Sequence, residues 1–281
     1  MSGAPRGGGD APRGRGGACA AAACPRGGGD SSRGRGGAAL RGLGVALAGA
    51  AVLAPPAGAA PPRCTGEHAA VGPPTRALAW QARVVAVTPV RRSLAGRERT
   101  RALDPADAAA VLVLDARLDP RGRCRLRVRL PTRPNDAAGW IDAHRVRLRA
   151  TPYRIEVRRA RRTVTLLRAG KRVRRFRAVV GTSGTPTPVG RFAVASVWRN
   201  RPGHFLGSWV LALSAHSEVL DTYDGGEGRV ALHGRGGASL RDPLGSAASH
   251  GCVRLSNAAI EALVRTVGEH RLPGVPVRVR R

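Results

Sequence analysis

Aromatic residues and lysines are scarce in this sequence. Only 3% of its 281 residues are aromatic, and Lys171 is the single lysine in a chain with a formal net charge of +30. Such a charge would by itself point to nucleic acid as a partner. Aromatic platforms for base stacking are few, however, and an arginine excess in a chain rich in Ala, Gly, Pro and Val is typical of G+C-rich coding. We therefore expect no nucleic-acid partner.

An apolar run long enough to cross a membrane is also lacking. A spanning helix needs about 20 apolar residues, and the uncharged stretch from Leu43 to Leu53 is shorter. Arginines precede it and small residues follow at 57–59, which is the order found in a secretory signal peptide. We interpret residues 43–60 as a signal-peptide-like segment, with retention as a membrane anchor as the alternative.

Large apolar side chains are missing from the two near-repeats at the start of the chain, Gly7–Ala18 and Gly27–Ala38. Without apolar burial, nothing offsets the entropy lost when such a segment becomes ordered. We therefore expect residues 1–42 to be a disordered leader rich in glycine and arginine.

The chain has five cysteines, and loss of the leader would remove Cys19 and Cys24. Of the remaining three, Cys64 and Cys124 both lie before residue 150 and are the natural disulfide pair outside the cytoplasm. Cys252 is then left over. An unpaired thiol in an exported protein is a candidate for a reactive role.

Residues 61–150 read as short strands, at 83–87, 110–118, 125–130 and 139–148. Alternation is clearest at 125–130, where Leu126, Val128 and Leu130 share one face and the intervening arginines share the other. The pattern predicts a small β domain. The segment 125–148 resembles one hairpin of a Src-homology-three-like barrel, a fold attached to many wall enzymes.

Residues 151–281 also read mainly as strands, at 153–157, 163–167, 176–180, 191–197, 208–214, 229–233 and 275–280. Gly170 is expected to supply a positive φ in the hairpin turn before Lys171. One segment has helical spacing. It follows Asn257, taken as the N-cap, and places four apolar residues on one face: Ile260, Leu263, Val264 and Val267.

The candidate chemistry lies between His233 and Asn257. A thiol has an ordinary pKa near 8.5, so acyl transfer by Cys252 needs a nearby base or positive field. His250, two residues away, and His233, at the end of a strand, are both candidates. Gly251 lets the backbone turn sharply before the sulfur and leaves amide N–H groups free to face an oxyanion.

His233-Gly234 followed by Ser249-His250-Gly251-Cys252-Val253-Arg254-Leu255-Ser256-Asn257 resembles the signature of the YkuD-type L,D-transpeptidases. The stretch TPTPVGRF at 185–192 also resembles that family's loop before a core strand. The resemblance covers about residues 152–280. It implies a mainly β fold, a YkuD-like β-sandwich with one helix after the catalytic cysteine, preceded here by a small β-barrel-like domain.

The resemblance also implies roles for individual residues. Cys252 would be the nucleophile and His233 the general base, oriented by a backbone carbonyl near Gly234. The amides of Gly251 and Cys252 would form the oxyanion hole. Arg254 would hold the active-site turn or a substrate carboxylate.

Two motif residues are implied to shape the active-site turn. These are Ser249 and His250, and for both a purely structural role remains open. Gly234 and Arg254 are the candidate substrate-binding residues.

The implied activity is formation of peptidoglycan cross-links between stem peptides through a cysteine thioester, with release of D-alanine. Neither metal nor organic cofactor is implied. We expect a monomer exported to the cell wall or the extracytoplasmic face of the membrane, where its charge would attract anionic wall polymers. The alternatives are an L,D-carboxypeptidase and an inactive wall-binding module, and the 61–150 domain is a candidate for wall binding.

Other polar residues receive plainer interpretations. His204, His216 and His270 have no partners in the sequence pattern and are expected at the surface. Asp221 and Asp224 lack the spacing of a calcium loop, so we expect a polar hairpin tip there.

Overall fold

The computed structural model describes residues 64, 70–106, 108–222 and 226–281, all of which fall in one compact unit, Gly58–Arg281. The leader expected at 1–42 and the signal-peptide-like segment expected at 43–60 lie outside the described residues. Within the described ranges, no helix combines the length and the apolar character needed to cross a membrane.

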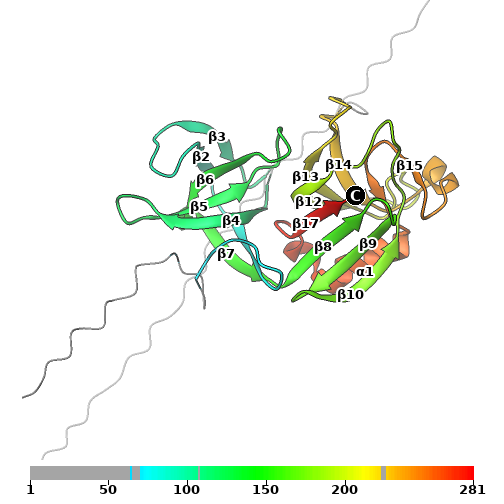
Figure 1. The fold of residues 1–281 in the computed structure, drawn as a ribbon, viewed down its shortest axis with the longest axis horizontal. Coiled ribbons are helices and arrows are strands. Elements are labelled where there is room, and N and C mark those ends of the chain that lie inside the picture. The colour runs from blue at the N-terminus through cyan, green and yellow to red at the C-terminus, as the bar shows by residue number, and fades with distance from the viewer. Residues whose placement is uncertain (1–63, 65–69, 107, 223–225) are drawn as a thin grey trace, which may run out of the picture. The chain divides into compact units, whose positions relative to one another are not determined.

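Seven antiparallel strands form the first sheet, in the order β3-β2-β6-β5-β4-β1-β7 (Figure 1). A 3₁₀ turn, η1 (Ala143–Arg145), separates the last two strands in sequence. The strands are β1 (Ala79–Val84), β2 (Thr88–Arg91), β3 (Arg99–Leu103), β4 (Ala110–Leu118), β5 (Cys124–Arg129), β6 (Ala138–Asp142) and β7 (Val146–Thr151).

The alternation predicted for residues 125–130 is largely confirmed. Leu126, Val128 and Leu130 are buried in the core of this sheet. Arg125 departs from the pattern because it is only 1% exposed, although the neighbouring Arg127 is exposed. The reason is a pair of carboxylates, Asp119 and Asp142, which form ion pairs with the Arg125 guanidinium.

Several predicted strand boundaries were wrong. The strand predicted at 83–87 starts earlier, as β1, and ends at Val84. The single strand predicted at 139–148 is divided, because β6 pairs with β5 while β7 pairs with β1. Strands β2 and β3 were not predicted, and four of the five residues of β3 are exposed, so it has little apolar alternation to reveal it.

A disulfide joins Cys64 to Cys124 at the start of β5, with 5.4 Å between the two Cα atoms. The bridge spans 60 positions of sequence and ties Cys64, which precedes β1 in sequence, to the central strand of the sheet. Cys252 is the free cysteine of the described chain.

Eight strands form the second sheet, in the order β10-β9-β8-β17-β12-β13-β14-β16, and two short strands pair beside it. Pairing is parallel between β8 and β17 and between β14 and β16, and antiparallel elsewhere in this sheet. The strands are β8 (Tyr153–Arg158), β9 (Thr163–Arg168), β10 (Lys171–Arg177), β11 (Val180–Gly181), β12 (Gly190–Arg199), β13 (Trp209–His216), β14 (Arg229–His233), β15 (Ala247–Ser249), β16 (Val253–Arg254) and β17 (Pro276–Arg280).

The hairpin between β9 and β10 follows the predicted turn. Ala169 has a φ of 48° and Gly170 a φ of 77°. The strand predicted at 176–180 is instead the end of β10 followed by the separate short strand β11.

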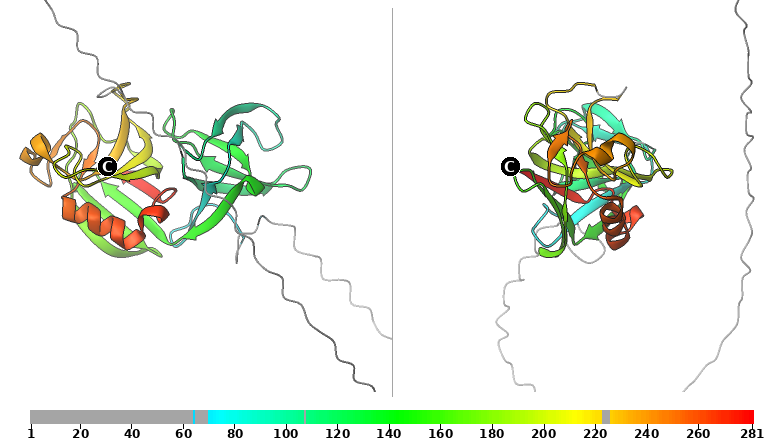
Figure 2. Two further views of the ribbon diagram at one scale, coloured as in Figure 1. Left: turned by 180° about the vertical axis from the view of Figure 1, so that it is seen from behind. Right: turned by 90° about the vertical axis from the view of Figure 1, so that its right-hand side faces the viewer.

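One α-helix, α1 (Asn257–Val267), is present among the described residues and packs beside the second sheet (Figures 1 and 2). Its buried face holds the four predicted residues, which join the core of the sheet: Ile260, Leu263, Val264 and Val267. The remaining helical turns are the 3₁₀ segments η2 (Gly237–Arg241) and η3 (Glu269–Arg271). The predicted mainly β architecture with one helix after the cysteine is confirmed.

The N-cap of α1 was predicted at the wrong residue. Ser256 is the N-cap, and its hydroxyl accepts a hydrogen bond from the Ala259 N–H at 3.2 Å. Asn257 is the first helical residue. Its side chain is used elsewhere, in the loops that lead to the candidate active site.

Candidate active site

Cys252 lies in a tight turn between β15 and β16, and this turn is held by Ser249. The buried Ser249 hydroxyl donates to the Cys252 carbonyl at 2.6 Å and accepts from the Gly251 N–H at 3.2 Å. The two hydrogen bonds join Ser249 to the residue that carries the sulfur and to the residue just before it. Ser249 therefore fixes the turn that presents Cys252.

Gly251 has a φ of 118°, a backbone conformation that L residues rarely adopt. Its carbonyl accepts a hydrogen bond from the buried Thr187 hydroxyl at 2.8 Å, and the same hydroxyl accepts from the Gly181 N–H at 3.0 Å. The proline-containing loop before β12 thus supports the turn from outside. The sequence analysis did not single out Thr187, although the TPTP stretch that contains it formed part of the family resemblance.

The predicted pair of oxyanion donors is changed by these contacts. The Gly251 N–H was expected to be free, but it donates to the Ser249 hydroxyl. The Cys252 amide is left as the candidate donor from this turn.

His233 ends strand β14, next to the strand that follows Cys252. The parallel register pairs Leu232 with Val253 and His233 with Arg254. Because side chains alternate along a strand, Leu232 and Val253 point into the core, where both are fully buried. His233 and Arg254 therefore point to the opposite face. Cys252, two residues before Arg254, reaches the same face.

The His233 ring is oriented by a backbone carbonyl. Its Nδ1 atom lies 2.7 Å from the Gly234 carbonyl oxygen. Since a carbonyl can only accept, Nδ1 carries the proton, and Nε2 of the neutral ring is the basic nitrogen. The expected orientation by a carbonyl near Gly234 corresponds to this contact.

Cys252, His233, His250 and Arg254 line one narrow cavity of about 40 Å³. The exposed His250 contributes to its lining from the turn itself. Loop residues from before β13 and after it complete the wall, including Phe205, Leu206, Ser217 and Leu220. The sulfur and the imidazole therefore share one small pocket.

Burial favours the neutral form of both the His233 imidazole and the Cys252 thiol. It lowers the pKa of His233 to about 4, against the opposing effect of the Gly234 carbonyl. It also raises the pKa of the Cys252 thiol, although the Ala231 backbone and the Arg254 charge favour the thiolate. At neutral pH the resting pair is therefore a neutral imidazole and a neutral thiol.

Arg254 is already engaged within the protein. Its guanidinium pairs with the Asp242 carboxylate and lies over the Phe205 ring, 5.6 Å from the ring centroid. Its backbone exchanges two hydrogen bonds of 2.9 Å with Val179. These contacts support the first of the two roles considered for Arg254, that of holding the turn.

Asn257 connects the first residue of α1 to the loop after His233. Its side-chain oxygen accepts from the N–H groups of Ser208 at 3.1 Å and Arg235 at 3.0 Å, and its amide donates to the Arg235 carbonyl at 3.0 Å. A Cβ at Gly234 would lie 2.1 Å from that oxygen. Gly234 is thus required by close approach, a structural reason beside the substrate-binding role predicted for it.

Two of the three histidines expected at the surface are exposed, His204 and His270. His216 is instead fully buried, at 0% exposure, beside Glu227. Asp224 lies outside the described residues. Within the described ranges, no three His, Cys, Asp or Glu side chains gather in a way that could hold a metal ion.

Residues 152–279 match the family model of YkuD, the L,D-transpeptidase catalytic domain. No curated protein matches the chain. Among solved structures, an L,D-transpeptidase of Enterococcus faecium is 19% identical over 46% of this chain and 49% of its own, with a TM-score of 0.34. This chain thus spans about half the length of that protein.

Two further solved structures show the same kind of similarity. An L,D-transpeptidase of Xylanimonas cellulosilytica is 24% identical over 46% of this chain and 60% of its own, with a TM-score of 0.33. L,D-transpeptidase 3 of Mycobacterium tuberculosis is 16% identical over 71% of this chain and 99% of its own, with a TM-score of 0.38. The resemblance predicted from the His233 to Asn257 motif is confirmed by the family match, and residues 152–279 are a domain of the YkuD L,D-transpeptidase family.

Proposed function

We propose that this protein is a peptidoglycan L,D-transpeptidase whose nucleophile is Cys252 and whose general base is His233. The observation that supports this most is the shared cavity, which His233 lines from the end of β14 and Cys252 lines from the turn before the adjacent parallel strand β16. The family of the surrounding domain supports the reaction class.

In the first step, the Cys252 sulfur attacks the carbonyl carbon of the third residue of a stem peptide. Nε2 of His233 accepts the thiol proton as the carbon–sulfur bond forms, because both groups are neutral at rest. The imidazolium that results is stabilised by the Gly234 carbonyl at Nδ1. The Cys252 amide donates to the developing oxyanion.

Collapse of the tetrahedral intermediate breaks the bond to the terminal D-alanine, and His233 returns its proton to the leaving amine. A side-chain amine of a second stem then attacks the thioester and gives a proton to His233. The carbon–sulfur bond breaks, and His233 passes that proton to the sulfur, which restores the thiol. The product links two third residues. If water attacks in place of the amine, the same site acts as an L,D-carboxypeptidase.

The remaining expectations belong to the same proposal. The protein is exported and works in the cell wall or at the extracytoplasmic face of the membrane, as a monomer. Residues 61–150 are proposed as a small β domain with wall binding as its candidate role, and the arginine-rich surface adds attraction to anionic polymers. Residues 151–281 form the catalytic domain.

Intact-protein mass spectrometry after exposure to a carbapenem tests the nucleophile. The native protein should gain one adduct, and Cys252→Ala should gain none. The absence of an adduct on the native protein would favour an inactive wall-binding module. Incubation with a tetrapeptide stem then separates the two activities, because cross-linking yields dimers and hydrolysis yields tripeptides.

A further inference from the structure

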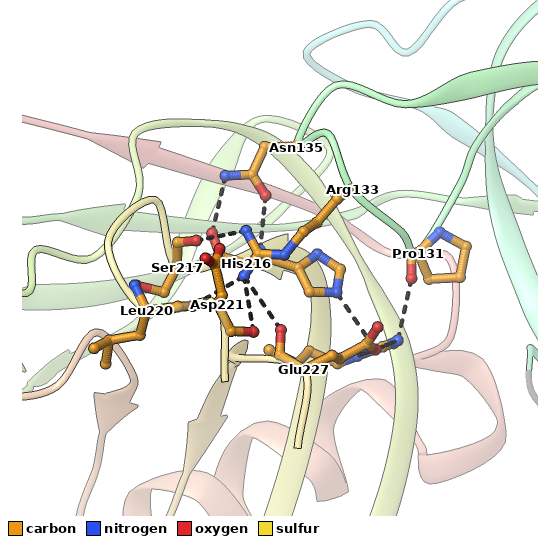
Figure 3. Close-up of polar contacts among 9 residues, drawn as sticks. Pro131, Arg133, Asn135, His216, Ser217, Leu220, Asp221 and Glu227 are labelled. Atoms are coloured by element: carbon orange, nitrogen blue, oxygen red, sulfur yellow. Dashed lines mark hydrogen bonds and ion pairs between the residues drawn. The ribbon is translucent and has the colours of Figure 1, made fainter. Parts of the chain in front are cut away.

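The loop between β5 and β6 reaches across to the second sheet, where it contacts the end of β13 (Figure 3). The Asn135 side-chain oxygen accepts from the His216 N–H at 2.7 Å, and the Asn135 amide donates to the His216 carbonyl at 2.9 Å. One carboxamide therefore takes the place of a neighbouring strand. It fixes the backbone of the last residue of β13.

Arg133, from the same loop, binds backbone carbonyls of the segment that follows. Nη1 donates to the Ser217 carbonyl at 2.8 Å, and Nη2 donates to the Leu220 carbonyl at 2.9 Å (Figure 3). Nη2 also lies 3.5 Å from the Asp221 carbonyl and 3.3 Å from the Glu227 carbonyl. Four carbonyls thus converge on one guanidinium, and hydrogen bonds from a charged donor are stronger than neutral ones.

A third contact joins the loop to the start of β14. Arg229 Nη2 donates to the Pro131 carbonyl at 3.1 Å, and the same guanidinium pairs with the Glu227 carboxylate. Glu227 in turn lies 3.4 Å from Nε2 of the buried His216. The loop is therefore attached to both strands that lead into and out of the segment.

The residues held in this way form part of the wall of the thiol cavity. Ser217, Leu220, Gly228 and Arg229 line it together with Cys252 and His233. Ser217 is further tied to Gly228 by a backbone hydrogen bond of 2.8 Å. A displacement of these backbone groups would therefore change the space around the sulfur and the imidazole.

We propose that Arg133 and Asn135 are positioning residues for the Cys252 site, so that the seven-stranded sheet sets the geometry of the substrate-facing wall. The catalytic consequence rests on the proposed transpeptidase function, whereas the positioning of the wall does not. Neither residue touches the sulfur, and both act through the backbone at 216–221.

Arginine is needed at 133 for a geometric reason. Its planar guanidinium offers several N–H groups in fixed directions, so that it can serve Ser217 and Leu220 together. A lysine would keep the charge but concentrate its donors on one nitrogen. We therefore expect the lysine of Arg133→Lys to hold the Ser217 and Leu220 carbonyls better than the alanine of Arg133→Ala would, but less well than the native Arg133.

The test uses the full chain and four variants: Arg133→Ala, Arg133→Lys, Asn135→Ala and the control Arg127→Ala. Arg127 is exposed on β5, the strand that leads into the loop, so the control removes the same charge close by. Three quantities are measured: alkylation of Cys252 by iodoacetamide, followed on its own peptide; amide hydrogen exchange at 216–222; and kcat/KM for a tetrapeptide stem.

For Arg133→Ala we expect Cys252 alkylation and exchange at 216–222 to rise about tenfold and kcat/KM to fall about tenfold, the change that corresponds to losing one strong hydrogen bond. Asn135→Ala should expose the His216 amide to exchange. Arg133→Lys should lie between Arg133→Ala and the native protein, and Arg127→Ala should match the native protein.

Arg133→Ala with alkylation and exchange equal to those of Arg127→Ala would overturn the proposal. If Arg133→Ala fails to fold, the same comparison is made with Arg133→Lys, whose equality with the control would also overturn it. A native protein that does not process the tetrapeptide would count against the transpeptidase function alone, because alkylation and exchange still report on the wall.

Discussion

The two sheets bury ionisable side chains in opposite ways. In the seven-stranded sheet, Arg125 is buried as a charged group between Asp119, at 3.0 Å, and Asp142. Burial raises the pKa of Asp119, but hydrogen bonds from the Arg123 amide and the Arg125 guanidinium outweigh this effect and hold it well below its ordinary value. In the eight-stranded sheet, His233 and Cys252 are both kept neutral by burial.

The difference separates a structural use of buried ionisable groups from a chemical one. Paired charges gain their energy from each other and have little tendency to exchange protons. A neutral imidazole beside a neutral thiol is poised instead for a proton transfer that occurs only when the sulfur finds an electrophile. Removing one group should therefore cost stability in the first sheet and rate in the second.

The largest effect is expected on rate. His233→Ala removes the general base and should lower kcat/KM for a tetrapeptide stem about a thousandfold, within the usual range for such groups. His250→Ala, which alters an exposed residue of the same cavity, should lower it less than tenfold. Steady-state kinetics on both variants provides the check, and equal defects would refute the assignment of the base.

The next effect is on stability. Arg125→Ala leaves Asp119 and Asp142 buried without their partner and should lower the free energy of unfolding by about 3–5 kcal/mol. Arg117→Ala breaks the exposed ion pair with Asp115 and should change it by less than about 1 kcal/mol. Urea denaturation measures both. If folded Arg125→Ala also lost Cys252 alkylation, the buried charges of the first sheet would affect the chemistry as well as the stability, and the distinction drawn here would be wrong.

The depressed pKa of His233 should also make stability depend on pH. In the unfolded chain His233 binds a proton near pH 6.5, and in the folded chain only near pH 4. The contribution of neutral His233 to the free energy of unfolding is therefore complete above pH 6.5 and is lost as the pH is lowered toward 4. The loss from His233 is roughly 3 kcal/mol. In His233→Gln the slope in this window should shrink to the part due to His216, whose pKa is also lowered by burial.

The smallest expected effect concerns the turn that holds the sulfur. Ser249→Ala removes two neutral hydrogen bonds, to the Gly251 amide and the Cys252 carbonyl, and should lower the free energy of unfolding by about 1–2 kcal/mol. Ser246→Ala is the matched control, because the hydroxyl of Ser246 has no hydrogen-bond partner among the described residues. Thermal unfolding of the two variants should differ accordingly.

Features encoded by neighbouring residues could be predicted from the sequence. The buried face of β5 follows from alternation, and the buried face of α1 follows from helical spacing. The candidate catalytic pair was found because the motif around Cys252 is short and because His233 ends a strand. Strand β3 escaped detection because four of its five residues are exposed, and β2 because it is only four residues long and contains Pro89.

Features that depend on distant contacts could not be predicted. Thr187 bonds to Gly251 across 64 positions, and Arg133 bonds to Ser217 across 84. His216 was placed at the surface because nothing near it in sequence shows that Asn135 and Glu227 surround it. Asn257 was assigned to a helix cap, where asparagine is common, although its side chain serves Ser208, 49 positions earlier.

The single carboxamide of Asn257 has a consequence for protein engineering. Because it joins the helix start to the segment next to His233, foreign peptides inserted at Gly234 would pull the imidazole away from its support. Gly237, three residues later, is exposed and has open space around it, but its φ of 52° favours glycine, and Gly236 and Ser239 bond to each other across it. Fusion tags or circularly permuted termini should therefore be kept out of this connection, at Gly234 because of its close neighbours and at Gly237 because of its backbone conformation.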